Sequence, residues 1–206
     1  MKFKKLIILL SIIFISLSWA HSQYHFVTSV YDGDTILIDT GEKVRYLGID
    51  APEIDLEGGK DEYMALESKA FNIRLVNRKK VSLEFDREKK DRYGRLLAYV
   101  YMDNGVMVNA LIVRRGLAHV LLKRPNLQYL ELLIESQRLA MTEKIGIWRK
   151  EPSRVEKYYL GNKNSHRFHR PGCPFGRKIR SHNLLMFQTR REAFWEGFSP
   201  CKRCRP

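Results

Sequence analysis

Five short segments with the composition of β-strands constrain the fold of this chain more than any other feature. They are residues 24–31, 35–39, 43–49, 81–85 and 96–102. Their apolar, β-branched and aromatic residues predict strands, and the Gly, Asp and Asn residues between the segments predict turns. Helical periodicity is present over residues 63–73, 106–115 and 126–144. Short strands with interspersed helices predict a small closed barrel flanked by helices.

The first twenty residues have the pattern of an export signal. Three lysines precede an apolar run from Leu6 to Trp19, and Ser18-Trp19-Ala20 supplies small residues at the spacing of a cleavage site. We therefore expect residues 1–20 to be a signal peptide, and the mature protein to be secreted or periplasmic. The alternative is an uncleaved membrane anchor, for which the run is short of the roughly 20 residues that a spanning helix needs.

Charge divides the rest of the chain into two parts. The net charge is +14, and residues 151–206 alone hold 13 basic and 4 acidic side chains. The segment Trp148-Arg149-Lys150-Glu151-Pro152 is typical of a boundary, so we expect one domain over residues 21–150 and a small basic domain over residues 151–206. In the second domain the sequence predicts one short helix, near residues 189–197. The positive charge makes polyanions the first partners to consider.

Three charged segments lie at the ends of predicted strands. They are Asp32-Gly33-Asp34-Thr35, the stretch from Arg45 to Asp50-Ala51-Pro52-Glu53, and Asp91-Arg92-Tyr93-Gly94-Arg95. Each alone is typical of a turn, a surface arginine or a charged loop. Together they offer carboxylates for a hard cation and a general base, with arginines that bind phosphate bidentately. These are the groups that hydrolysis of a phosphodiester requires.

With these motifs in this order, the sequence resembles the thermonuclease (staphylococcal nuclease-like) family over roughly residues 24–149. The segments Gly116-Leu117-Ala118 and Gly146-Ile147-Trp148 also fit. The resemblance implies an OB-fold barrel with helices, in the α+β class. It also implies a calcium-dependent endonuclease, a hydrolase of DNA and RNA, which we expect to be a monomer without a protein partner.

The resemblance assigns four residues to the calcium site. Asp34 and Asp50 would bind Ca²⁺ through their carboxylates, and the backbone carbonyl of Ala51 would help. Asp32 would support these ligands from behind. Few carboxylates and a carbonyl oxygen suit calcium in an exported protein, where affinities near 10⁻⁴ to 10⁻³ M suffice.

The resemblance also assigns residues to the substrate. Glu53 would be the general base that orients the attacking water, and Arg45 and Arg95 would clamp the phosphate. Arg92 and Tyr93 would contact a neighbouring phosphate of the nucleotide. Because water attacks, and not a ribose 2′-hydroxyl, we expect DNA to be cut as well as RNA.

One segment departs from the family pattern. Where the type member has two tyrosines, this chain has Leu121-Leu122-Lys123-Arg124. The resemblance therefore does not extend to base stacking on those tyrosines. Lys123 and Arg124 can contact the phosphate backbone instead, which would weaken base preference.

The C-terminal domain carries two half-sites for zinc. His169 and Cys173 form a His-x₃-Cys pair, and Cys201 and Cys204 form a Cys-x₂-Cys pair. Sulfur and imidazole ligands favour a structural Zn²⁺ over calcium. The alternatives are a Cys201–Cys204 disulfide, which export permits, and His166 as the nitrogen ligand.

Residues 159–204 resemble an Ada-type metal-binding domain. Because the Ada repair proteins use four cysteines, His169 is a departure, and their methyl-transfer chemistry does not carry over. The resemblance implies contact with nucleic acid, and the charge of this domain agrees with it. A zinc-stabilised basic domain with no specific ligand is the alternative.

Three function classes fit these observations. The first is an exported phosphodiesterase with a basic zinc-bound accessory domain. The second is a catalytically silent nucleic-acid-binding protein on the same fold, and the third is a metal-dependent regulator or surface adhesion protein. A binding protein has no physical need for the complete set of Asp34, Arg45, Asp50, Glu53 and Arg95, so the set favours the enzyme.

Overall fold

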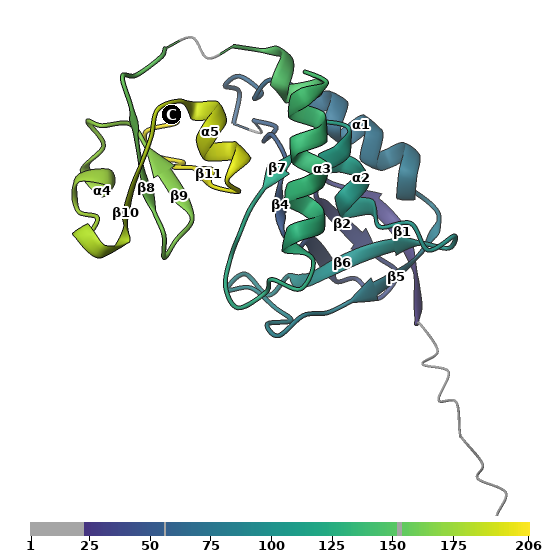
Figure 1. Ribbon diagram of the computed structural model, residues 1–206. Helices are drawn as coiled ribbons and strands as arrows, with labels where there is room; N and C mark the ends of the chain where they lie inside the picture. Colours follow the sequence, from purple (N-terminus) through teal and green to yellow (C-terminus); the bar gives the residue numbers. More distant parts are fainter. Residues whose placement is uncertain (1–22, 56, 152–153) are drawn as a thin grey trace, which may run out of the picture.

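A computed structural model describes residues 23–55, 57–151 and 154–206 (Figure 1). The predicted signal peptide, residues 1–20, lies outside the described residues. Among the residues that are described, no helix combines the length and the apolarity needed to cross a bilayer.

Five strands form a closed barrel in the order β1-β2-β3-β6-β5, which confirms the predicted barrel. Their bounds are Tyr24–Val30 (β1), Thr35–Ile38 (β2), Lys43–Tyr46 (β3), Lys80–Glu84 (β5) and Leu96–Met102 (β6). β3 and β6 are parallel, with Arg45 opposite Leu97, and the other pairs are antiparallel. Because alternate side chains face inward, Val44 and Tyr46 are buried in the core while Arg45 lies at its edge.

The predicted strand over residues 43–49 is in fact two strands. It breaks at Gly48, which has a φ of +76°, and where an added Cβ would lie 2.4 Å from Cδ1 of Leu133. A residue with a side chain fits neither the left-handed backbone nor this close approach. The chain therefore turns out of the barrel into β4 (Ile49–Asp50), which pairs with β7 (His119–Val120).

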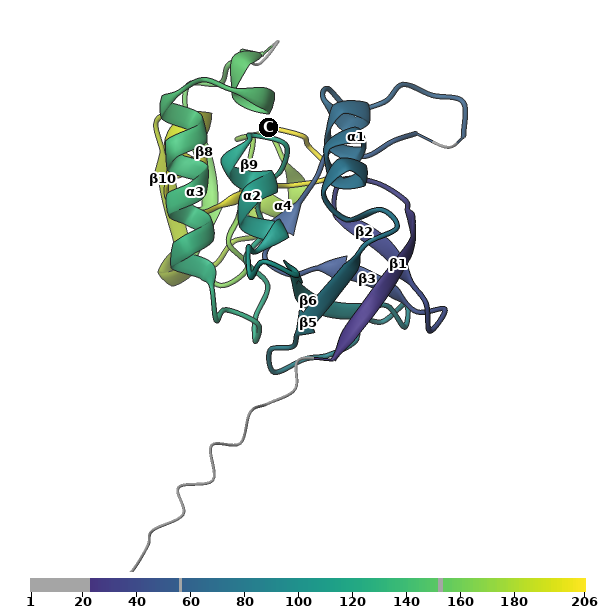
Figure 2. The same ribbon diagram turned by 90° about the vertical axis from the view of Figure 1, so that its right-hand side faces the viewer.

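Three helices accompany the barrel: α1 (Ala65–Val76), α2 (Val108–Arg114) and α3 (Leu130–Thr142). α3 begins four residues later than the predicted 126. Asn126 instead joins a loop, where its side-chain amide donates to the carbonyl of Glu88 and accepts from that residue's N–H, both at 2.8 Å. In Figure 2, α1 covers one end of the barrel.

The C-terminal part forms a second, smaller sheet in the order β10-β8-β9-β11. Its strands are β8 (Tyr159–Asn162), β9 (Arg167–His169), β10 (Leu184–Phe187) and β11 (Ser199–Pro200), with helices α4 (Pro174–Arg177) and α5 (Arg190–Trp195). A separate apolar core of Tyr159, Phe168, Phe187, Phe194 and Phe198 holds it together, and Met141 of α3 joins this core. In Figure 1 the unit lies on the side of α3 away from the barrel.

The structure confirms the predicted fold class of a barrel with helices plus a small C-terminal unit. The sequence predicted the short helix, which α5 matches; its Thr189 side chain accepts from the N–H of Glu192 at 3.0 Å and caps it. The strands of the second sheet were not predicted from the sequence. The exact boundary between residues 150 and 151 stays a prediction.

Candidate active site and zinc site

A buried arginine between two aspartates forms the centre of the candidate active site. The Arg45 guanidinium lies 2.8 Å from Oδ2 of Asp34 and 2.7 Å from Oδ1 of Asp50. It also donates to the carbonyls of Tyr46 and Ile49, at 3.2 and 3.0 Å. Its side chain is 13% exposed. These contacts hold the guanidinium in one orientation at the barrel edge.

The turn that carries Asp34 is packed tightly against its surroundings. An added Cβ on Gly33 would lie 1.9 Å from Oγ of Ser68 and 2.7 Å from the Cβ of Ala51, so only glycine fits. Oδ2 of Asp34 accepts from the N–H of Ala51 at 2.6 Å. Oδ1 of Asp32 accepts from the backbone N–H of Asp34 at 2.9 Å, and the supporting role of Asp32 stays a prediction. The two predicted calcium segments therefore meet.

The surroundings shift the pKa values of the two aspartates in opposite directions. Burial raises the pKa of Asp34 to about 8, and Arg45 offsets this only in part. Burial also opposes ionisation of Asp50, but His119, Arg45 and Lys202 together lower the pKa of that carboxyl below its usual value. The carboxyl groups of Asp32, Asp34, Asp50 and Glu53 gather around Arg45 and Lys202. Carboxylate oxygens are the hard donors that a divalent cation such as calcium takes.

His119 is a site residue to which the sequence assigned no role. It lies directly opposite Asp50 in the β4–β7 pair, with its Nε2 3.9 Å from Oδ2 of that aspartate. Burial lowers the pKa of His119, and the neighbouring Asp50 offsets this in part. Its place beside Asp50 depends on the pairing of two residues far apart in sequence, which no local pattern reveals.

Glu53 lies at the rim of a cleft next to this centre, and its side chain is 58% exposed. The cleft has a volume of about 720 Å³ and lies between the barrel and the C-terminal unit. Asp50, Ala51 and Glu53 line the cleft on the side of the barrel, and Lys202 lines it on the side of the C-terminal unit. A carboxylate in such a place is open to water, as a general base must be.

The predicted phosphate clamp is brought together only in part. Arg95 pairs with Asp91, with Nε and Nη2 both 2.8 Å from Oδ2. Within the described residues its guanidinium makes no ion pair with Asp34, Asp50 or Glu53. Arg92 lies over the ring of Tyr93, 4.8 Å from the centroid, and that tyrosine is 68% exposed. The roles of Arg92, Tyr93 and Arg95 stay predictions.

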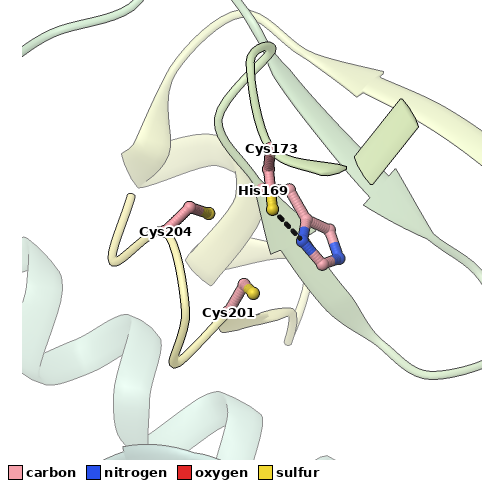
Figure 3. A group of neighbouring side chains, drawn as sticks. All are labelled: His169, Cys173, Cys201 and Cys204. Atoms are coloured by element: carbon pink, nitrogen blue, oxygen red, sulfur yellow. Dashed lines mark hydrogen bonds between the residues drawn. The ribbon is translucent and has the colours of Figure 1, made fainter. Parts of the chain in front are cut away.

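The predicted zinc ligands form one cluster. The ligand atoms of His169, Cys173, Cys201 and Cys204 lie within 4.8 Å of one another. Figure 3 shows the three sulfur atoms and the imidazole directed towards a common space, with Cys173 Sγ 3.5 Å from Nδ1 of His169. Three sulfurs and one imidazole nitrogen are a complete tetrahedral donor set for zinc.

The alternatives for this cluster do not match the structure. All three cysteines are free, so the Cys201–Cys204 disulfide is not formed. His166 is outside the cluster, and its ring packs on Phe198 with centroids 5.0 Å apart. Of the two histidines, His169 is therefore the one whose ring nitrogen lies with the three sulfur atoms.

Replacing Cys173 by serine should weaken zinc affinity by on the order of a hundredfold or more, because loss of a ligand costs at least as much as loss of a supporting contact. His166→Gln should leave the affinity unchanged. Competition with a colorimetric chelator measures both variants. Undiminished affinity in Cys173→Ser, or a comparable loss in His166→Gln, would contradict the assignment.

Known proteins match both parts of the chain. Residues 43–150 match the family model described as staphylococcal nuclease homologue, and residues 146–206 match the model described as metal binding domain of Ada. The thermonuclease of Staphylococcus hyicus is 38% identical over 135 residues, which are 64% of this chain and 79% of that protein. The thermonuclease of Staphylococcus intermedius is 35% identical over 129 residues, which are 61% and 76%.

A bacterial endonuclease is similar over a shorter share of its length. Endonuclease YncB of Bacillus subtilis (strain 168) is 40% identical over 124 residues, which are 58% of each protein. The barrel, the acidic cluster and these matches lead to one conclusion: the chain belongs to the staphylococcal nuclease homologue family, with a zinc-binding domain of the Ada type at its C-terminal end.

Proposed function

We propose that this protein is an exported, calcium-dependent endonuclease that hydrolyses phosphodiester bonds of DNA and RNA. The observation that carries the proposal is Arg45, held at 2.7 to 2.8 Å by Asp34 and Asp50 beside a cleft that Glu53 lines. The relatives named thermonuclease and endonuclease support the reaction class. The pattern of residues 1–20 supports export.

The acidic cluster suits calcium. Its donors are carboxylate oxygens of Asp34 and Asp50, close to the backbone of Ala51, and hard oxygen donors are those that calcium takes. Asp34, Asp50 and the carbonyl of Ala51 would hold the ion. When bound, calcium would supply positive charge to polarise a phosphoryl oxygen.

Glu53 and Arg45 have separate roles in the proposed reaction. Glu53 is exposed enough to accept a proton from a water molecule in the cleft. Arg45 is already oriented, so it can stabilise charge that grows on the phosphoryl oxygens with no further ordering. A guanidinium stays charged at any working pH. Since water and not a sugar hydroxyl attacks, the reaction does not distinguish DNA from RNA.

The test is cleavage of single- and double-stranded DNA and RNA by the mature chain. We expect products from DNA and from RNA with millimolar calcium and none when a calcium chelator is added. Zinc is supplied in both samples, so that the chelator arm does not report on the C-terminal domain. Activity that a calcium-selective chelator leaves unchanged would refute the calcium requirement.

A further inference from the structure

A lysine of the zinc-binding domain reaches into the nuclease site. Nζ of Lys202 lies 3.1 Å from Oε1 of Glu53 and 3.6 Å from Oδ2 of Asp50. Lys202 belongs to the Cys201-Lys202-Arg203-Cys204 segment, so two zinc ligands fix its backbone within one short turn. Its side chain is 62% exposed. The domain thus adds a positive charge next to the proposed base.

Contacts with α3 hold this domain in place. Gln137 is fully buried; its Oε1 accepts from the N–H of Val120 and its Nε2 donates to the carbonyl of Phe194. Arg138 donates to the carbonyl of Trp195 at 2.9 Å. Gln137 therefore links α5 directly to β7, the strand that pairs with Asp50 of β4. The position of Lys202 follows from buried contacts and not from a loose surface encounter.

Arg170, Arg190 and Arg205 of the same domain also line the cleft, and the first two of these serve a different purpose. Arg170 donates to the carbonyls of Cys204 and Arg205, and Arg190 donates to the carbonyl of Pro206. Both guanidiniums therefore hold the C-terminal segment in place. The ammonium of Lys202 instead pairs with carboxylates across the cleft.

Lys202 could either block the nuclease site or contact the substrate, and the strength of its ion pairs decides between these two roles. The pair with Asp50, whose side chain is 7% exposed, is the longer of the two at 3.6 Å. Lys202 and Glu53 are both more than half exposed, and an exposed pair of this kind changes a binding equilibrium by a factor of about five at most. That is too weak to keep a divalent cation or a polyanion out of the site. The flexible stem of lysine also lets the ammonium exchange a carboxylate for a phosphate oxygen within a few ångströms.

We propose that Lys202 is a substrate-binding residue of the nuclease site, which contacts a phosphate of the strand that is cut, beside the phosphate that Glu53 and Arg45 serve. The inference rests on the proposed nuclease function. It makes the zinc-binding domain part of the active cleft and not a separate nucleic-acid-binding module. The zinc ligands Cys201 and Cys204 then position a residue that touches the substrate.

The experiment compares Lys202→Met with the wild-type chain under saturating calcium and zinc. We expect kcat/KM for a single-stranded oligodeoxynucleotide to fall about ten- to hundredfold, as for loss of a hydrogen bond to a charged group. The slope of log(kcat/KM) against log[salt] should become shallower by about one, which a purely structural role would not cause. Lys202→Arg should keep most of the activity.

Lys163→Ala is the matched control, because Lys163 is an exposed lysine of the same domain outside the cleft. It should leave kcat/KM and the zinc content unchanged. An unchanged salt slope in Lys202→Met, or a gain of activity from an unblocked site, would overturn the inference. An inactive wild-type chain would refute the proposed function instead, and the oligonucleotide Kd of Lys202→Met would then decide the phosphate contact.

Discussion

Replacing Glu53 by glutamine should lower kcat by about 10² to 10⁴, the range that a positioned general base contributes. The amide cannot accept a proton from water, but it keeps the size of the side chain. Because Glu53 is 58% exposed and its side chain pairs only with Lys202 among the described residues, the melting temperature should hardly change. Oligonucleotide binding should persist, since the variant removes a negative charge from the cleft. Single-turnover cleavage and fluorescence anisotropy measure the two effects separately.

Glu57→Gln is the control for this variant. Glu57 is an exposed carboxylate of the same loop and lines the same cleft. It should retain nearly full turnover. If Glu53→Gln also cleaves at the wild-type rate, Glu53 is not the base.

Replacing Arg45 by alanine should reduce both stability and turnover. The substitution leaves Asp34 and Asp50 buried without their shared cation, and breaking a buried pair costs about 3 to 5 kcal/mol. Since the pKa of Asp34 is already raised to about 8, that carboxyl can take up a proton, which brings the cost towards the lower end. A transition-state arginine is worth about 10³ to 10⁵ in rate in other phosphoryl-transfer enzymes. Urea unfolding and cleavage rates measure the two losses.

Arg45→Lys separates the two effects. A lysine restores the positive charge beside the aspartates and should recover part of the stability. Its single ammonium cannot reproduce the planar fork that meets two carboxylates and a phosphate, so turnover should stay low. Full turnover in Arg45→Lys would show that only the charge matters, and a stable, active Arg45→Ala would rule out the proposed clamp.

The barrel was predictable because its strands are rich in apolar, β-branched and aromatic residues and are bounded by turn residues. β1, β2, β5 and β6 lie within one residue of the predicted bounds at each end. The exception is residues 43–49, where the break at Gly48 depends on Leu133 of α3, a residue 85 positions away. The late start of α3 also has a tertiary cause, since Asn126 bonds to the backbone of Glu88. The periodicity of a local segment carries no information about contacts between residues that are distant in the sequence.

The centre of the site was predictable from the types of residue present. A charged side chain near the core needs a partner of opposite charge. In the structure, Arg45 is that partner for both Asp34 and Asp50. The contribution of the C-terminal domain was not predictable. A glutamine in an amphipathic helix is typical of the surface, yet Gln137 is buried between β7 and α5. Without that docking contact, nothing in the sequence places Lys202 beside Glu53.

The most direct measurement of the central claim follows binding and cleavage of one labelled oligonucleotide in the same sample. The mature wild-type chain is mixed with single-stranded DNA, and calcium is raised from zero to several millimolar. If Arg45, Glu53 and the aspartates form a nuclease site, the strand is bound and is then cut at a rate that rises with calcium to a plateau. Binding without cleavage at every calcium concentration would contradict this account, because it would identify a nucleic-acid-binding protein that retains the fold without the reaction.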